Sequence, residues 1–413
     1  MHRQMRFFLR AHPRLASPHT MPQDLERDKQ TTRKRPRASK RVIEPLVFVR
    51  DSIRWPQCAE RGENHHPSPA AHHSSRCVIV DDLSHQSSRE EYDVIISSGC
   101  DVLRVTVDLT ADTSTSVERG KERALRPGRV SGTSETTTIG RASARREIQA
   151  LNASDDGLRL YAVDDHGVMD CWTRDGEDGG AWRATASGTG SSDVAGVGGW
   201  CGVFPLGDDG RVVVAKSASR TLDVYDGDRR VRRMNTLLRP YDAATTASVG
   251  GDGRVLCVAE GHHLAVYDDR VAERGGCANR IPLGYNKPLF AVSASKAHGK
   301  EHVVACGGEE RVVHVLDVRK WGCTQRWRNA VKFDITQIEL SATAPEFAYV
   351  AGLDYECMCG DWQAMDASGG FSFRADSRWM GLASRPTASG CDVLAGWAES
   401  GAVYALRARP ESE

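Results

Sequence analysis

Residues 211–226 read RVVVAKSASRTLDVYD, which is an apolar run, a short turn of small and polar residues, and a second apolar run. Two Val-rich runs bounded by turn residues are the signature of a β-hairpin. Six other segments have the same form, at residues 94–109, 158–172, 254–268, 302–317, 347–362 and 391–406. The chain therefore contains seven copies of one hairpin.

The hairpins recur at a nearly constant interval. Their starts lie 64, 53, 43, 48, 45 and 44 residues apart, and the two longest intervals contain a Ser/Thr-rich and a Gly-rich insertion. The underlying period of about 45 residues fits a blade of four strands. A further short strand precedes the hairpins, as at residues 77–80, 148–152 and 289–293, and such strands bury their faces only by radial stacking. We therefore predict an all-β chain folded as a single seven-bladed β-propeller.

The hairpins resemble those of the WD-repeat family. Residues 224–226, 266–268 and 315–317 close a strand as that family's Trp-Asp dipeptide does, and residues 307–312 resemble its glycine-acidic turn. The resemblance covers about residues 77–406, although no blade ends in Trp-Asp and the Gly-His dipeptide that the family places before its inner strand is absent from those positions. It implies a non-catalytic scaffold that binds protein or peptide partners, as one subunit of a larger complex.

The seventh blade lacks an outer strand, because the last hairpin ends at Leu406, close to the C-terminus. The apolar run LVFV at residues 46–49 is expected to supply that strand and so remove an open sheet edge. The propeller is thus predicted over residues 46–409. Flexible insertions are predicted at residues 51–76 and 110–146, because their polar composition cannot bury a core.

Residues 1–45 are predicted to form a disordered basic arm, because they show no helical or strand periodicity. Residues 1–50 hold 13 Lys and Arg against 4 Asp and Glu, whereas residues 51–413 hold 42 against 51. An acidic body repels a polyanion, so any nucleic acid would be bound by the arm. The alternative function is therefore a chromatin- or nucleic-acid-associated adaptor that docks through this arm.

The N-terminal arm also bears on localisation. Residues 1–20 are rich in Arg and lack acids, as in an organelle transit peptide, and both Met1 and Met21 fit as the start. No apolar run approaches the ~20 residues of a membrane span, and the 12 cysteines lack the spacing of a disulfide framework. We expect an intracellular protein, nuclear or cytoplasmic, with no membrane anchor. A run typical of nuclear-localisation signals comprises Arg33, Lys34, Arg35, Arg37, Lys40 and Arg41.

Catalytic and metal-binding motifs are missing from the sequence. It contains no GxSxG elbow, P-loop or HExxH helix. Cys58, Cys77 and the paired histidines at residues 65–66 and 72–73 lack zinc-site spacing, and residues 357 and 359 are interpreted as core thiols. We expect no catalytic residues, no metal and no cofactor. An enzyme with a site in the central channel is a third hypothesis, because a fold does not determine activity.

Partner contacts are expected on one face of the propeller. In the WD-repeat arrangement, the turn inside each hairpin and the loop entering each inner strand emerge on the same face. Trp, Tyr and Arg on such loops are frequent interaction hot spots. For Trp379 and Trp397, packing between blades is the alternative. Ser143, which lies among arginines, is a candidate phosphorylation site. The predicted partner-binding residues are Arg239, Tyr241, Tyr285, Phe333, Tyr355, Arg378, Trp379 and Trp397.

Overall fold

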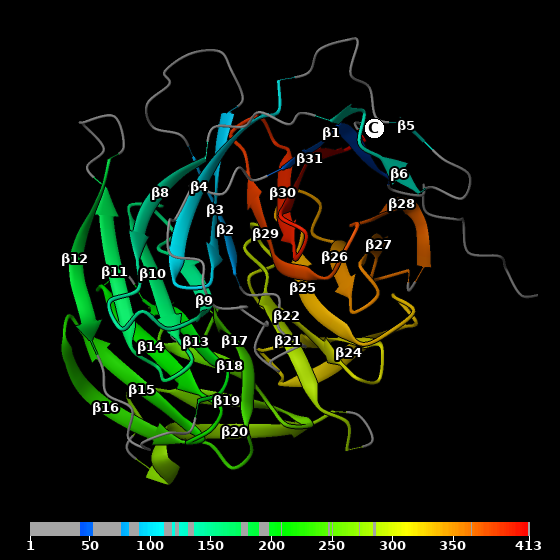
Figure 1. Cartoon of the computed structure of the whole chain (residues 1–413). Coiled ribbons are helices and arrows are strands. Elements are labelled where there is room, and N and C mark those ends of the chain that lie inside the picture. The colour runs from blue at the N-terminus through cyan, green and yellow to red at the C-terminus, as the bar shows by residue number, and fades with distance from the viewer. Residues whose placement is uncertain are drawn as a thin grey trace, which may run out of the picture. The chain divides into compact units, whose positions relative to one another are not determined.

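The chain folds as an all-β, seven-bladed propeller of antiparallel sheets, as predicted (Figure 1). All the blades lie in the compact unit Arg41–Glu413. Within the described ranges, no helix is long and apolar enough to cross a membrane, and the 3-10 segment η2 spans Glu273–Gly276. The computed structural model describes residues 42–52, 76–81, 91–110, 118–119, 124–130, 136–174, 181–189, 198–207, 209–246, 248–249, 251–271, 273–283, 286–364 and 366–411.

Each of blades 2 to 6 consists of four strands that follow one another along the chain. From the inner to the outer strand, blades 2 and 3 are β9 (Ile148–Ala153), β10 (Arg159–Asp164), β11 (Met169–Arg174) and β12 (Trp182–Thr189), then β13 (Cys201–Leu206), β14 (Arg211–Lys216), β15 (Thr221–Asp226) and β16 (Arg229–Asn235). Blades 4 to 6 are β17 (Pro240–Thr246), β18 (Val255–Glu260), β19 (His263–Asp268) and β20 (Cys277–Pro282), then β21 (Leu289–Ala294), β22 (Val303–Gly308), β23 (Val312–Asp317) and β24 (Gly322–Arg328), then β25 (Ile335–Leu340), β26 (Phe347–Gly352), β27 (Glu356–Asp361) and β28 (Asp366–Arg374).

Blade 7 combines the two ends of the propeller. Its first three strands are β29 (Trp379–Pro386), β30 (Asp392–Ala398) and β31 (Ala402–Pro410). Its fourth strand is β1 (Ile43–Ser52), which pairs antiparallel with β31 along its length. The predicted closure by an N-terminal strand is therefore confirmed, and the strand is longer than the run at residues 46–49. The short strand β7 (Arg129–Val130) extends this sheet by pairing parallel to β1.

Blade 1 takes its outer strand from within a predicted insertion. It comprises β2 (Cys77–Asp81), β3 (Glu91–Ser98), β4 (Asp101–Asp108) and β8 (Thr136–Arg141), and β8 pairs antiparallel with β4. A two-stranded hairpin of β5 (Glu118–Arg119) and β6 (Leu125–Arg126) precedes it. An outer strand needs little apolar surface because one side faces water. The insertion predicted at 110–146 therefore does not extend over β8, and within the range 51–76 the structure describes only β1's last two residues and Arg76.

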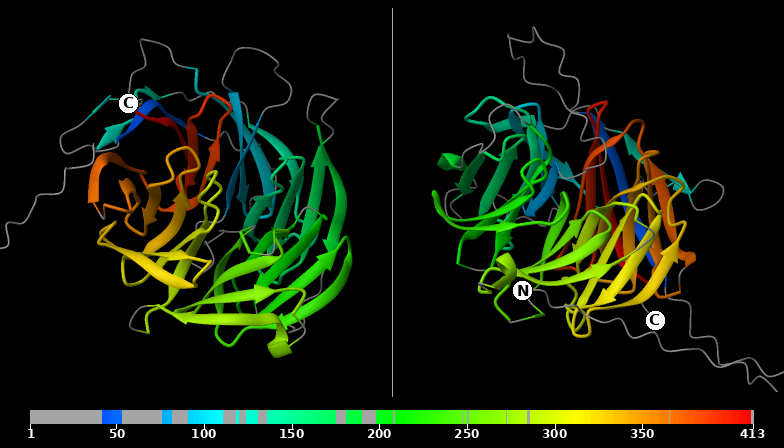
Figure 2. Two further views of the ribbon diagram at one scale, coloured as in Figure 1. Left: turned by 180° about the vertical axis from the view of Figure 1, so that it is seen from behind. Right: turned by 90° about the horizontal axis from the view of Figure 1, so that it is seen from below.

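The hydrophobic core forms a closed ring. Seven buried clusters fill the seven interfaces between neighbouring blades. Strands β18, β22 and β26 are buried along their whole length, whereas the outer strand β16, of sequence RRVRRMN, is largely exposed. Each inner strand contacts the next around the ring, including β2 with β29. Figure 2 shows the blades arranged around the centre of this ring. In blades 4 to 6 the second strand is therefore the most buried, while an outer strand such as β16 is the most exposed.

An aspartate ends the third strand in several blades and begins the turn into the outer strand. Its carboxylate accepts a hydrogen bond from the backbone N–H two residues later, which is the geometry of an Asx turn. This is a structural reason for the Asp in the pattern that resembles WD repeats. The pairs are Asp108 with Thr110 (2.8 Å), Asp268 with Arg270 (2.9 Å), Asp317 with Arg319 (3.0 Å) and Asp361 with Gln363 (2.7 Å).

Candidate functional site

Two sets of loops meet on one face, which we call the upper face. They are the turns between the second and third strands and the loops leading from an outer strand into the next inner strand. Within a blade, a backbone N–H of the turn donates a hydrogen bond to a carbonyl of the loop. These bonds fix the loops to one another and make the upper face a rigid surface. They join Gly261 to Arg239 (3.1 Å), Glu309 to Pro288 (3.1 Å), Leu353 to Asp334 (2.9 Å) and Glu399 to Arg378 (2.9 Å).

Three turns of the upper face hold a large side chain in the left-handed region. Arg220, Arg311 and Tyr355 have φ of 55°, 59° and 71°, while Gly167 and Gly401 occupy the corresponding positions in blades 2 and 7. A non-glycine residue costs about 1–2 kcal/mol in this conformation. Backbone strain of this kind concentrates at functional sites.

The strained turns are also anchored by hydrogen bonds. The carbonyls of Arg220, Arg311 and Tyr355 each accept a bond from the N–H that follows the outer strand, at 2.9–3.0 Å. The guanidinium groups of the two arginines donate to the carbonyls of Leu237 (3.3 Å) and Lys332 (3.0 Å) in the next loop. The turns therefore hold their side chains in fixed positions.

The structure distributes the predicted partner-binding residues over several environments. Arg239, Phe333 and Tyr355 are exposed, with Phe333 at 47% and Tyr355 at 41% of full accessibility. Tyr241 is half-buried against Phe290, edge to face at a centroid distance of 5.5 Å. The half-buried Arg378 has its Nε 3.7 Å from an oxygen of Glu399. Tyr285 lies outside the described residues.

Trp379 and Trp397 do not belong to the exposed surface, because both are buried. The indole N–H of Trp379 donates to the carbonyl of Tyr355 (2.9 Å), and that of Trp397 donates to the carbonyl of Arg76 (2.9 Å). These bonds join blade 7 to blades 6 and 1. The prediction placed Trp397 in a turn, but it belongs to β30 and the turn begins at Glu399. Both tryptophans therefore stabilise interfaces between blades.

Leu237 is an exposed residue that the sequence analysis did not select. It lies in the loop entering blade 4 and is 56% exposed. With Phe333 and Tyr355, it makes three of the four exposed large hydrophobic side chains among the described residues, and the fourth, Val231, lies on the outer strand β16. The sequence could have indicated this residue, because residues 237–238 are an apolar pair in the loop between a polar outer strand and the next inner strand.

Charged groups surround these apolar side chains. Lys332 Nζ lies 5.4 Å from the centroid of the Phe333 ring, within range of a cation–π interaction. Beside Tyr355, Asp354 forms an ion pair with Arg374 at 2.5 Å. A surface with apolar centres and a charged rim has the composition of a protein-binding site.

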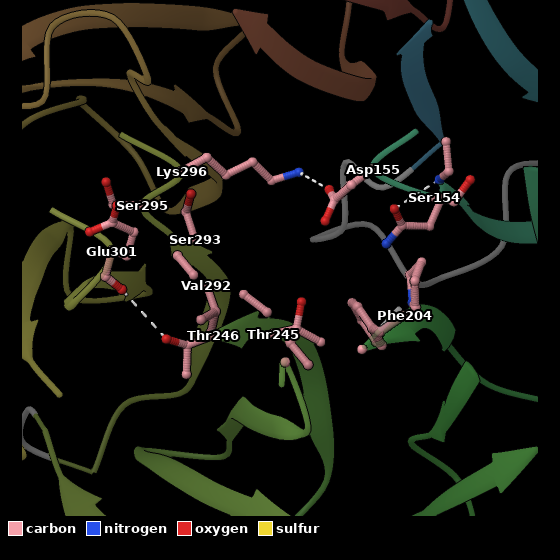
Figure 3. Close-up of a pocket in the computed structure, with 18 of the residues that line it drawn as sticks. Ser154, Asp155, Phe204, Thr245, Thr246, Val292, Ser293, Ser295, Lys296 and Glu301 are labelled. Atoms are coloured by element: carbon pink, nitrogen blue, oxygen red, sulfur yellow. Dashed lines mark hydrogen bonds and ion pairs between the residues drawn. The ribbon is translucent and has the colours of Figure 1, made fainter. Parts of the chain in front are cut away.

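The opposite, lower face opens into the central channel, with a cavity of about 660 Å³ (Figure 3). Its walls are the ends of inner strands and the loops that follow them. Lys296 reaches across the opening to Asp155, with Nζ 2.8 Å from a carboxylate oxygen. The hydroxyl of Thr246 donates a hydrogen bond to the backbone carbonyl of Glu301 (3.5 Å). The cavity is polar, and the ion pair of Lys296 with Asp155 connects blades 5 and 2.

Two carboxyl groups lie on inner strands, Asp242 on β17 and Glu339 on β25. Burial raises the pKa of Asp242 to about 8, although the N–H groups of Val292 (2.7 Å) and Ala243 (2.9 Å) donate to it. Burial also raises the pKa of Glu339, whose oxygens accept hydrogen bonds from Gln337 (2.9 Å) and Ser384 (3.2 Å). The bonds from Val292 and Ser384 tie neighbouring inner strands together, which is a structural use for both groups.

The remaining predicted sites fall partly outside the described residues. These include the six basic residues Arg33–Arg41, together with Cys58 and the paired histidines. Ser143 is exposed in the loop entering blade 2, and its N–H donates to Asp170 (3.0 Å). Cys357 and Cys359 are buried thiols, as expected. Among the described residues, no three His, Cys, Asp or Glu side chains are grouped to hold a metal ion.

Comparison with known proteins adds no family. No protein-family model matches the chain, and no curated protein matches it. The class that the fold defines is a seven-bladed β-propeller, which is commonly an interaction scaffold. Its function must therefore be argued from its own surfaces.

Proposed function

We propose that this propeller is a non-catalytic scaffold of the WD-repeat type. It binds protein or peptide partners through its upper face and forms part of a larger complex. The observation that carries the proposal is the concentration of exposed Leu237, Phe333 and Tyr355 on loops that are fixed by backbone hydrogen bonds. Rigid aromatic residues on such loops lose little conformational entropy on binding.

The strained turns also support the upper face as the binding surface. Six of the seven described non-glycine residues with positive φ lie there, in turns or in loops entering an inner strand. A glycine would fit these positions without strain. The protein therefore keeps large side chains at positions 220, 311 and 355 although they lower its stability. Such a cost is expected where the side chains contact a partner.

A matched pair of variants tests this proposal. The tagged full-length chain is used to capture partners, which are identified by mass spectrometry. The triple variant Leu237→Ser, Phe333→Ala and Tyr355→Ala should lose these partners while its melting temperature stays near that of the wild type. Val231→Ser removes an exposed apolar side chain outside the upper face and should keep them. Equal capture by both variants would contradict the proposed face.

The basic N-terminal arm supports a second candidate function, docking on chromatin or another nucleic-acid assembly in the nucleus. Residues 1–50 contain 13 cationic and 4 acidic residues, and this positive charge favours binding to nucleic acid. Binding of DNA by the full chain should weaken steeply with salt and disappear when residues 1–40 are removed. Because β1 begins at Ile43, this truncation leaves the propeller intact. DNA binding that survives the truncation would contradict this role of the arm.

A further inference from the structure

A second cavity, of about 710 Å³, opens at the edge of the upper face between blades 4 and 5. Its walls come from the loop entering blade 5, the turn of that blade and the outer strand β24. Four of the six lining side chains with a permanent charge are cationic, and two are acidic. One cation, Lys287, is already paired with Glu309. The cavity therefore keeps a positive excess that comes from its arginines.

Arg326 and Arg328 supply the unpaired positive charge. They are two residues apart on β24, so both side chains stand on the same side of the sheet. Both are exposed, and neither has a hydrogen-bond or ion-pair partner in the part of the chain that the structure describes. Two guanidinium groups on one side of a strand can bind the oxygens of a single anion, and the planar fork of Arg favours phosphate and carboxylate.

A buried histidine forms the back of the same cavity. His314 pairs with Arg326 across strands β23 and β24, and it is only 3% exposed. Its Nδ1 has no hydrogen-bond partner among the described residues, and its Nε2 is 3.9 Å from Glu310. Burial and the charge of Arg326 lower the pKa of His314, which favours the neutral form of the ring. A buried polar atom without a partner is destabilising, and a hydrogen bond from a ligand would remove that cost.

The cavity is continuous with the proposed partner surface. Arg311, which lines it, donates to the carbonyl of Lys332 (3.0 Å), and the exposed ring of Phe333 follows in the same loop. A peptide that covers Phe333 can thus place a neighbouring side chain in the cavity. This continuity favours a peptide-borne group over a free anion.

We propose that the cavity between blades 4 and 5 is a subsite for a phosphorylated Ser or Thr side chain of the partner. Arg326 and Arg328 bind the phosphoryl oxygens, and His314 offers one hydrogen bond from the buried end. The two arginines match the charge of about −1.5 to −2 on a phosphate monoester at pH 7. The inference rests on the proposed function, because it assumes that a peptide lies on the upper face.

The test uses the full-length chain and degenerate peptide pools with phosphoserine, serine or glutamate at the central position, with inorganic phosphate as a further probe. The phosphoserine pool should bind at least about tenfold more tightly than the serine pool. The double variant Arg326→Gln, Arg328→Gln should remove this preference for phosphoserine. The variant His314→Leu should lower the affinity for the phosphoserine pool about threefold or more. The control is the double variant Arg183→Gln, Arg229→Gln, on the outer strands of blades 2 and 3. It should leave the preference for phosphoserine unchanged.

Three results would overturn the inference. In the first, the serine pool binds as tightly as the phosphoserine pool. In the second, the glutamate pool binds as tightly as the phosphoserine pool. In the third, inorganic phosphate binds as tightly as the phosphopeptides. A phosphoserine preference that survives in the double arginine variant would overturn the assigned residues. These results leave the proposed function standing if partner capture still depends on Leu237, Phe333 and Tyr355. The two proposals therefore fail separately.

Discussion

Tyr355 shows how one residue can serve the core through its backbone and a surface through its side chain. Its carbonyl accepts the indole N–H of the buried Trp379, while its ring is 41% exposed. Its φ of 71° is unfavourable for a residue with a side chain. The backbone function can be performed by glycine, but the surface function cannot.

Tyr355→Gly separates these two functions. Relief of the left-handed strain should offset the lost contacts, so the free energy of unfolding should stay within about 1 kcal/mol of the wild type. Affinity for a captured partner should fall about tenfold or more, as for an aromatic hot spot. Urea unfolding and a binding titration on the same preparations measure both quantities. A glycine variant that binds normally would exclude this ring from the interface.

Trp379→Ala should instead act on stability. The side chain is buried against Phe373 and Tyr404, at centroid distances of 5.9 and 5.4 Å, so its loss should lower the free energy of unfolding by about 3–5 kcal/mol. The exposed Phe333 is the control, and Phe333→Ala should change stability by no more than about 0.5 kcal/mol. Similar melting temperatures for the two variants would contradict the assignment of Trp379 to the core.

Sequence reasoning placed these aromatic residues near the upper face but could not separate exposed from buried ones. Phe333 and Tyr355 point outward, whereas Trp379 and Trp397 are buried and find backbone carbonyls for their indole N–H groups. That difference depends on neighbours far apart in the chain, such as Arg76 beside Trp397. A pattern along the chain contains no record of such contacts.

Asp242 should make stability depend on pH. Its pKa rises from the ordinary 3.8 to about 8 in the folded protein because of burial. Between these values the folded chain binds more protons than the unfolded chain, so the free energy of unfolding should fall as the pH rises from about 4 to 8. Asp242→Asn should flatten this dependence, measured by urea unfolding at several pH values. Identical slopes for the two proteins would refute the assignment to this carboxyl.

At the level of elements, the sequence predicts the inner three strands of a blade better than the outer one. Strands such as β18 and β22 are fully buried and read as continuous apolar runs. The outer strands β8 and β16 face water, and their sequences TTTIGR and RRVRRMN have no strand pattern. The fourth strand of blade 1 was therefore missed, whereas the apolar outer strand β1 of blade 7 was found.

The closing strand gives a prediction at this level. Removing residues 1–52 deletes β1, including Phe48, exposes the edge of β31 and uncovers the apolar residues that pack against Phe48. The melting temperature should fall steeply, because several buried large side chains are lost at once. Removing only residues 1–40 should leave it unchanged, as scanning calorimetry can show. Equal melting temperatures for the two truncations would contradict the structural importance of β1.

The whole propeller differs from an open repeat array because its interfaces form a ring. In an open array each repeat contacts only its two neighbours, and the terminal repeats can unfold first. Here seven hydrophobic clusters join seven blades, and β2 contacts β29 to complete the circle. Because the ring has no terminal blade, no blade has only one neighbour, which is where unfolding of an open array would begin.

Cooperativity around the ring is therefore testable with the same truncation. In the chain lacking residues 1–52, the lost strand belongs to blade 7, but blade 4 lies across the ring from it. If the ring unfolds as one unit, amide protection in β18 should fall by as much as in β30, because both open only by global unfolding. Hydrogen exchange with mass spectrometry measures both strands, with the chain lacking residues 1–40 as the control. Loss of protection confined to blade 7 and its two neighbours would show that the blades unfold separately.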